Sequence, residues 1–322
     1  MNANKIVSFI IPHKGRFDML KRTLWSIEQQ HYPHELIEII VVSQTPQISD
    51  ETLSNSLAAQ LQVFVRPSSD TISALRNFGV KHAKGDYLAF LDADIELSAN
   101  WIEHMVNQLN MEKRIIVSAM QIANVDAPPL EIIRTELSNV ELDCNVAFLP
   151  GRNLFMLRSS FDVIGDFPEH LITCEDYYFT DKAARLGPLY YSSGASYIHL
   201  GEDKQYTEMF KKELWRGQSN LQSIKGRSIP LREIPSFVLP LWIVGCFLLS
   251  LLITVFAQAS EIAGLLLVLA LLPLMAYSLR LFSVAKNKVR LHNIVKFYLY
   301  YFPARAIGTV VGLFKSINAN HK

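Results

Sequence analysis

Residues 85–97 read GDYLAFLDADIEL, and this stretch decides the fold class. The five apolar residues 87–91 form the pattern of a strand that is buried on both faces, and Asp92 and Asp94 follow directly where it ends. Strands of this kind belong to parallel sheets covered by helices, in which ligands bind at the carboxyl ends of the strands. The stretch therefore predicts an α/β fold with both aspartates at a ligand site.

Strand and helix patterns alternate on both sides of this stretch. Three more strands are predicted, two of them buried, at 6–11 and 37–42, and a third at 61–65. Helical periodicity marks residues 19–27 and 73–83. Residues 145–200 add short strand-like pieces and a helix over about 176–185. This order predicts one α/β domain, which we place at residues 1–225.

The C-terminal part of the chain is much more apolar than the rest. Half of the 322 residues are hydrophobic and the mean hydropathy is +0.17, and the excess is concentrated in two charge-free runs, 237–257 and 262–279. Each run is close to the ~20 residues that cross about 30 Å of hydrocarbon, and a short polar turn joins the two. We therefore expect a transmembrane hairpin within residues 226–290, with spans at about 237–257 and 262–282.

Basic residues at the outer ends of the hairpin predict its orientation. Lys225, Arg227 and Arg232 precede the first span, and four more basic residues lie at 280–290. Because basic flanks favour the cytoplasmic side, we expect the domain at 1–225 on the cytoplasmic face, in a bacterial inner membrane. No signal peptide is expected, since the apolar run near the N-terminus is short and ends at Pro12.

Residues 291–322 form a third part. Lys296, Pro303 and Arg305 interrupt its apolar pattern, which predicts an amphipathic helix pair at the membrane surface. Four aromatic residues would then lie at headgroup depth: Tyr298, Tyr300, Tyr301 and Phe302. A third membrane span over about 291–314 is the alternative.

Charge and cysteine content exclude other classes of protein. The 31 Lys and Arg residues nearly balance the 30 Asp and Glu residues, so the net charge of +1 provides no basic field for a nucleic acid. The three cysteines form no C-x-x-C pair, and we expect neither a zinc site nor a disulfide framework.

Two pairs of carboxylates carry the predicted chemistry. Asp92 and Asp94 suit Mg²⁺ or Mn²⁺ bound to a diphosphate, although an acidic turn before a helix has the same pattern. Glu175 and Asp176 open a helix, where such residues are either N-terminal caps or a general base for a sugar hydroxyl. His199 follows a strand-like segment and is either a metal ligand or a structural hydrogen-bonding group.

Four segments, in this order, resemble family 2 glycosyltransferases with the GT-A fold. They are 7–16 (VSFIIPHKGR), 73–97 (SALRNFGVKHAKGDYLAFLDADIEL), 151–171 (GRNLFMLRSSFDVIGDFPEHL) and 174–187 (CEDYYFTDKAARLG). The resemblance covers residues 7 to about 220 and implies a Rossmann-like nucleotide-sugar-binding domain with a mixed sheet. It also implies that Asp92 holds the nucleotide ribose and that Asp94 binds the metal and diphosphate, with His199 nearby. Asp176 would be the catalytic base, with Glu175 beside it.

Other residues near the strand ends are candidates for substrate contacts. After the second strand the family usually has an aspartate, where this chain has Ser43 and Gln44, so base recognition departs from the pattern. Besides Asp92, the candidate nucleotide-binding residues are Pro12, His13, Ser43, Gln44, Arg66, Arg76 and Asn77. The candidate contacts to acceptor or phosphate are Arg152, Asn153, Trp215 and Arg216.

The sequence also limits the type of transfer. Processive polysaccharide synthases of this family resemble one another in a Q-x-x-R-W motif, which residues 213–218 (ELWRGQ) lack. We therefore predict a membrane-anchored, inverting glycosyltransferase that moves one sugar from a nucleotide-sugar donor to a hydroxyl of a lipid-linked glycan or glycolipid. Such an enzyme would belong to cell-envelope polysaccharide biosynthesis. The alternatives are transfer to polyprenyl phosphate itself and a non-catalytic, nucleotide-sugar-binding membrane scaffold.

Overall fold

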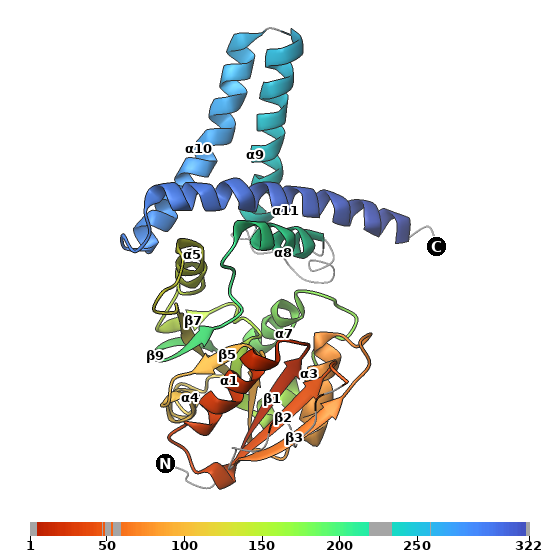
Figure 1. The fold of residues 1–322 in the computed structure, drawn as a ribbon, viewed down its shortest axis with the longest axis vertical. Helices are drawn as coiled ribbons and strands as arrows, with labels where there is room; N and C mark the ends of the chain where they lie inside the picture. Colours follow the sequence, from red (N-terminus) through yellow and green to blue (C-terminus); the bar gives the residue numbers. More distant parts are fainter. Residues whose placement is uncertain are drawn as a thin grey trace. The chain divides into compact units, whose positions relative to one another are not determined.

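The computed structural model describes residues 5–46, 48, 53, 59–218, 234–257 and 259–319 (Figure 1). The chain divides into two compact units, the first made of Met1–Asn124 with Ser138–Gly201 and the second of Val125–Leu137 with Glu202–Lys322. The first unit thus ends at Gly201, whereas the sequence predicted a domain boundary near residue 225. That boundary, together with Lys225, Arg227 and Arg232, lies outside the described residues.

The first unit is built on a nine-stranded sheet, counted over the described residues, in the order β3-β2-β1-β4-β8-β6-β9-β5, with β7 paired to β9. The strands are β1 (Val7–His13), β2 (Ile37–Ser43), β3 (Gln60–Val65), β4 (Tyr87–Leu91), β5 (Ile95–Leu97), β6 (Ile116–Ile122), β7 (Cys144–Val146), β8 (Asn153–Leu157) and β9 (Leu189–His199). The first four strands in this order are parallel, and β8 then pairs antiparallel with β4. The prediction of an α/β domain with a mixed sheet is confirmed.

Burial along the strands follows their place in the sheet. β1, β2 and β4 are buried at every residue, as their unbroken apolar runs predicted. β3, predicted as a strand at 61–65, is only partly buried. Because β3 is the edge strand of the sheet, it has a partner on one side only and its faces are less completely covered.

Helices cover both faces of this sheet. They are α1 (Phe17–Glu28), α3 (Ile72–His82), α4 (Trp101–Leu109), α6 (Arg158–Ile164) and α7 (Glu175–Ala184), with a short 3₁₀ turn η1 (His34–Leu36). Alternate side chains of β1 point to opposite faces: Phe9 packs in a cluster with residues of α1 and α4, and Ile10 in a cluster with residues of α3, α6 and α7. Both faces are therefore apolar cores, and the carboxyl ends of β1 and β4 remain for polar residues.

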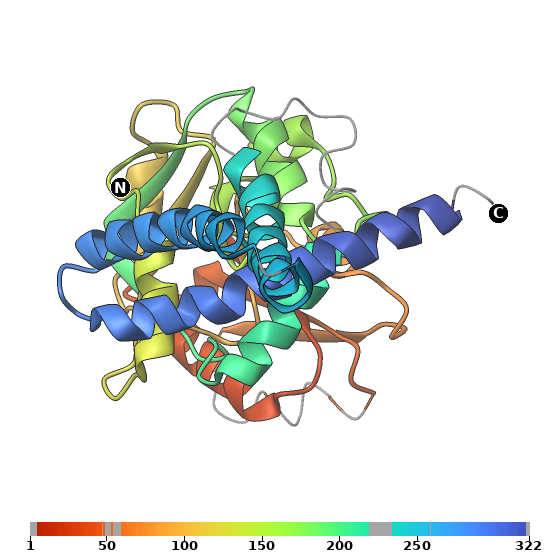
Figure 2. The ribbon, with the colours of Figure 1, turned by 90° about the horizontal axis from the view of Figure 1, so that it is seen from above.

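The second unit is helical. It contains most of α5 (Pro129–Ser138), together with α8 (Tyr206–Gln218), α9 (Ile234–Leu252) with a π-turn at Ile253–Ala257, α10 (Ser260–Val284) and α11 (Leu291–Ala319). Ile234–Ala257 and Ser260–Val284 are long and apolar enough to cross a membrane, with mean hydropathies of 2.5 and 2.3, and 22% of each apolar window is buried. The two helices run side by side, and Ser250 Oγ donates to Ala263 O at 2.7 Å (Figures 1 and 2). They match the hairpin that the sequence predicted.

α11 differs from the predicted helix pair, because it continues through Pro303 as one helix. It packs closely on α8: a Cβ at Gly308 would lie 2.4 Å from Leu214 O. This close packing supports the helix beyond Pro303, where the missing N–H would otherwise favour a break. Tyr298 and Phe302 are buried against Tyr277 of α10, and their depth in a membrane stays a prediction.

Candidate active site

A cavity of about 190 Å³ opens in the first unit at the carboxyl ends of β1 and β4. Its lining residues are Pro12, Lys14, Gly15, Arg16, Ile72, Asp92, Ala93 and Asp94. Both aspartates follow β4, and the loop 14–16 follows β1, so the two central parallel strands deliver their polar ends to one place. The structure thus puts Pro12, Asp92 and Asp94 where the sequence predicted a ligand.

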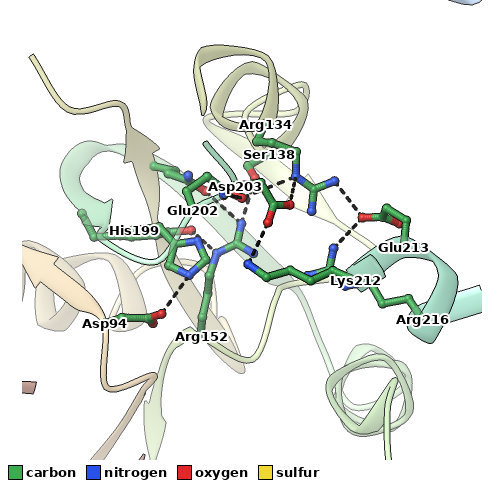
Figure 3. Close-up of polar contacts among 12 residues, drawn as sticks. Asp94, Arg134, Ser138, Arg152, His199, Glu202, Asp203, Lys212, Glu213 and Arg216 are labelled. Carbon is green, nitrogen blue, oxygen red and sulfur yellow. Dashed lines mark hydrogen bonds and ion pairs between the residues drawn. The ribbon is translucent and has the colours of Figure 1, made fainter. Parts of the chain in front are cut away.

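Asp94 is the centre of a polar cluster beside this cavity. Arg16 donates from a terminal guanidinium nitrogen to Asp94 Oδ2 at 2.9 Å, and His199 Nε2 lies 3.5 Å from the same oxygen (Figure 3 shows the His199 contact). His199 is brought there by the antiparallel pairing of β9 with β5, in which it faces Ile95. Arg16 begins α1 with a left-handed backbone, φ 50°, a conformation that non-glycine residues adopt at a cost.

The chemistry of this cluster fits a divalent cation. Burial raises the pKa of Asp92, and the nearby Asp94 acts in the same direction against Arg76. Among the described residues no three His, Cys, Asp or Glu side chains lie together so that they could hold a metal ion by themselves. A cation bound at Asp94 would therefore take most of its ligands from substrate oxygens and water, as is usual for Mg²⁺.

Gly201 allows Asp94 and Arg16 to approach the chain end of β9. A Cβ built at Gly201 would lie 2.2 Å from Asp94 Oδ2 and 2.5 Å from an Arg16 guanidinium nitrogen. We expect Gly201→Ala to displace the carboxylate and to weaken Mn²⁺-dependent binding of the donor by about 10- to 100-fold, the usual effect of disturbing the surroundings of a metal ligand. The melting temperature should change little.

The measurement is a Mn²⁺ titration of donor binding, with Gly245→Ala as the matched control. A Cβ at Gly245 meets nothing within 4 Å, so that variant should behave as the parent. A Gly201→Ala protein with the Mn²⁺ dependence of the parent would show that Asp94 does not hold the cation.

Arg76 joins the aspartates after β4 to the start of α7. Its side chain is 1% exposed, and its guanidinium donates to Glu175 Oε1 at 2.9 Å, Asp92 Oδ1 at 3.0 Å and Gly151 O at 3.1 Å. Burial raises the pKa of Glu175 to about 7, with Asp176 acting in the same direction and Arg76 opposing them. Although we expected Arg76 to contact the donor, its guanidinium is directed to protein carboxylates.

Asp176 is held by two backbone N–H groups. Gly151 N donates to its Oδ2 at 3.0 Å and Tyr177 N to its Oδ1 at 2.8 Å. The N-cap position of α7 is Cys174, with φ 63°, so Asp176 lies inside the first turn rather than at the cap. Gly151 therefore contacts both Asp176, through its N–H, and Arg76, through its carbonyl. The predicted base and the predicted ribose ligand Asp92 belong to one connected network.

Several other predicted contact residues have structural partners instead of lining the cavity. Asn77 donates to Phe167 O and Glu169 Oε1, each at 2.9 Å, and Asn153 is fully buried, with its Oδ1 3.4 Å from Ala119 N. Of all the predicted donor-contact residues, Pro12, Asp92 and Asp94 appear in the lining of this cavity as it is described.

The end of β2 holds its neighbouring loops in place. His13 Nδ1 and Ser43 Oγ are 2.9 Å apart, and Gln44 Nε2 donates to Pro67 O at 3.0 Å and Asp70 O at 2.8 Å. Arg66 is paired with the Asp70 carboxylate at 2.8 Å. The Gln44 amide thus holds the loop at residues 67–70, and its role toward the nucleotide base stays a prediction.

Arg152 lies in the loop before β8. It donates to Tyr197 Oη at 2.8 Å, Gln121 Oε1 at 3.0 Å and Ser138 Oγ at 2.8 Å. Trp215 and Arg216 lie on α8 in the second unit, where Trp215 is half exposed and Arg216 is 2.6 Å from Glu213 Oε1. Their role toward the donor or acceptor stays a prediction.

Lys14, Arg16 and Gly201 are among the residues of the site that were not predicted. Lys14 and Arg16 lie in the quoted segment 7–16, and basic residues directly after a buried strand at a helix start are a signal for an anionic ligand. Gly201 has no comparable signal, because its importance depends on a contact with Asp94, 107 positions earlier in the sequence (201 − 94).

Comparisons with known proteins agree with the fold. Residues 8–165 match the family described as Glycosyl transferase family 2. The glycosyltransferase AglE of Haloferax volcanii is 24% identical over 251 residues, which are 75% of this chain and 81% of that protein. An uncharacterized glycosyltransferase of Rickettsia felis is 29% identical over 198 residues, 58% of this chain but 32% of its own length.

A solved structure has a similar fold. The mannosyltransferase PcManGT from Pyrobaculum calidifontis, in complex with GDP-Man and Mn²⁺, superposes with a TM-score of 0.60 and 15% identity, over 96% of this chain and 88% of that one. At this identity the likeness concerns the fold.

Proposed function

Because the first unit is a family 2 glycosyltransferase domain with the GT-A fold, we propose that the protein is an inverting, metal-assisted glycosyltransferase that uses a nucleotide-sugar donor. The observation that best supports this proposal is that Asp92 shares a cavity with Asp94 and a hydrogen-bond network with Asp176. Asp92 and Asp94 line the cavity, and Arg76 and Gly151 link Asp92 to Asp176. A donor site and a base for the acceptor are thus held in one arrangement.

The reaction follows from the roles of these residues. The acceptor oxygen forms a bond to the anomeric carbon of the donor while the bond from that carbon to the diphosphate oxygen breaks. Asp176 takes the proton of the attacking hydroxyl, since each of its oxygens retains a lone pair after accepting one backbone N–H. Attack on the face opposite the leaving group inverts the anomeric configuration, and no covalent enzyme intermediate is formed.

Asp94 and His199, with Asp92 beside them, would hold Mg²⁺ or Mn²⁺. When bound, this cation neutralises the charge that develops on the departing nucleoside diphosphate. Lys14 and Arg16 line the same cavity and contribute positive charge toward the phosphates. The cavity is therefore suited to a leaving group that carries several negative charges.

A membrane location is proposed from α9 and α10. Their apolar side chains are mostly outside the packed part of the second unit, so a hydrocarbon environment would stabilise them. The basic flanks of the hairpin support a cytoplasmic catalytic domain. An enzyme held there meets lipid-linked acceptors, and we therefore infer a lipid-linked glycan or glycolipid as acceptor, in cell-envelope polysaccharide synthesis at a bacterial inner membrane.

The membrane anchor gives a direct prediction. The full-length protein should stay in the membrane fraction after washing with 1 M salt or alkaline carbonate (about pH 11) and should be released by detergent, because two apolar helices cannot leave hydrocarbon without detergent. The check is immunoblotting of pellet and supernatant. Recovery of the protein in the carbonate supernatant would rule out the transmembrane hairpin.

The proposed reaction is tested by the stereochemistry of its product. We expect an α-linked donor to give a β-linked product, observed by NMR from the anomeric proton coupling of the newly linked sugar. Retention of the donor configuration would contradict the inverting mechanism.

Mass analysis of the same product identifies the acceptor. A sugar linked through phosphate would identify polyprenyl phosphate as the acceptor, and that reaction needs no general base. We expect a sugar linked to a hydroxyl oxygen instead, because the fixed carboxylate of Asp176 suits an acceptor that must lose a proton.

A further inference from the structure

An apolar groove lies within the second unit, between α9 and α11. Its volume is about 450 Å³, and it is lined by Phe237, Val238, Leu241, Trp242 and Thr309. Val238, Leu241 and Trp242 are 51%, 40% and 48% exposed, so these side chains form the walls of an open groove rather than a packed core. Exposed apolar walls of this size require a hydrophobic occupant.

The groove lies near one end of the proposed first span. Residues 237–242 belong to the first half of Ile234–Ala257, and at 1.5 Å per residue Trp242 is about 12 Å along this helix from Ile234. This is the end that the basic flanks place toward the cytoplasm. Within the second unit, α11 crosses the hairpin at this end (Figures 1 and 2). The groove is therefore at the depth where lipid chains meet their headgroups.

A buried group of charged residues lies close to the groove along α11. Thr309 Oγ1 donates to Arg305 O at 2.8 Å, one turn away, and Arg305 Nε lies 3.5 Å from Glu213 Oε2. Arg134 is 3.0 Å from the other Glu213 oxygen and 3.4 Å from Glu202 Oε1 (Figure 3). The ion-pair group consists of Arg134, Lys212, Arg216 and Arg305 with Glu202, Asp203 and Glu213.

The ion-pair group carries a small excess of positive charge. Burial disfavours the ionised form of Glu213, but Arg134, Arg216 and Arg305 outweigh it and hold the pKa of Glu213 below its usual range. Four cations and three carboxylates then leave a net charge of +1 (4 − 3). Lys212 and Arg216 are each 40% exposed, so part of this positive charge is accessible to a ligand.

We propose that the groove binds the hydrocarbon chain of the lipid-linked acceptor, with the acceptor's phosphate toward Arg216 and Arg305. An apolar groove whose Thr309 lies one helix turn from Arg305, a member of the positively charged ion-pair group, is complementary to a molecule with a long apolar chain and an anionic head. The inference rests on the proposed function, because it assigns this lipid to the acceptor. It adds a site that fixes the acceptor's lipid rather than its sugar.

Photolabelling tests the site directly. The full-length protein, in nanodiscs of phosphatidylcholine, is exposed to an isoprenyl phosphate that carries a diazirine on its chain, and labelled residues are mapped by mass spectrometry. We expect the label within residues 237–242 and protection by excess unlabelled isoprenyl phosphate but not by the same amount of phosphatidylglycerol. Label spread along both α9 and α10, or equal protection by phosphatidylglycerol, would show that ordinary bilayer lipid occupies the groove and would overturn the proposal.

Variants that fill the groove provide the second test. Val238→Trp and Leu241→Trp add bulk at exposed wall positions and should lower labelling by about tenfold or more, whereas Leu248→Trp, at a similarly exposed position of the same helix outside the groove, should not. Equal labelling of all three variants would contradict the proposal.

Donor binding is measured on the same preparations. A parent protein that binds the donor but captures no lipid phosphate contradicts this inference alone. A parent protein that binds no donor contradicts the proposed function.

Discussion

Asp176→Asn is expected to lower turnover by about 10²–10⁴, the contribution of a general base, with almost unchanged affinity for the donor. The asparagine amide has nearly the same shape as the carboxylate but cannot take the proton of the acceptor hydroxyl. It can still accept one of the two backbone N–H bonds that now come from Gly151 and Tyr177. The loss of the other bond should cost about 0.5–1.5 kcal/mol of stability.

Three measurements on one preparation separate a base from a structural residue: the melting temperature, the donor affinity and the single-turnover rate. Asp181→Asn is the matched control, because Asp181 is on the same helix and pairs with Arg185 at the surface. That variant should keep the parent rate. A folded Asp176→Asn protein that turns over near the parent rate would remove Asp176 from the mechanism.

Arg76→Met is expected to destabilise the first unit by about 3–5 kcal/mol, the usual cost of removing one partner from a buried ion pair. Methionine fills a similar volume but leaves Glu175 without the guanidinium that now lies 2.9 Å away and Asp92 without the one at 3.0 Å. Arg66→Met is the matched control. Arg66 pairs with Asp70 while itself 38% exposed, so its loss should cost only ~1 kcal/mol or less.

The destabilisation by Arg76→Met should depend on pH. The pKa of Glu175 is about 7 in the folded parent, above its ordinary value of 4.5, and removal of Arg76 would raise it further. Between the unfolded and folded pKa values the native state then binds more protons than the unfolded state, so stability falls as pH rises through this range. Chemical unfolding in detergent at pH 5 and pH 8 should show the larger deficit at pH 8. A cost no greater than that of Arg66→Met at both values would contradict the role of Arg76.

The central strands and the acidic residues of the site could be predicted from the sequence because their signals are local. Unbroken apolar runs identify β1, β2 and β4, and Asp92 and Asp94 follow the last of these directly. Parallel pairing of β1 with β4 then places those aspartates beside the end of β1. The strands and the position of the aspartates need only the neighbours of a residue along the chain and the general rule for ligand sites in such sheets, whereas the pairing of β1 with β4 is seen in the structure.

Features that depend on distant contacts were not predictable in this way. Arg76 looked like a donor contact, and its internal role depends on Glu175, 99 positions later, being brought against it. The partial exposure of β3 depends on the strand order of the whole sheet. The continuity of α11 through Pro303 depends on its packing against α8 at Gly308, which the local pattern of a helix breaker does not contain.

Metal-dependent binding of a nucleotide sugar to the cavity at Asp92 and Asp94 is the measurement that tests the proposed activity most directly. The full-length protein is titrated by calorimetry with a panel of UDP- and GDP-sugars, in Mn²⁺ and in EDTA, beside a folded Asp94→Ala variant. We predict that at least one donor binds in Mn²⁺, and that its affinity falls by about tenfold or more both in EDTA and in the variant, because the same carboxylate would hold cation and diphosphate. Binding of no nucleotide sugar, or equal binding in Mn²⁺, in EDTA and in Asp94→Ala, would contradict the proposed activity.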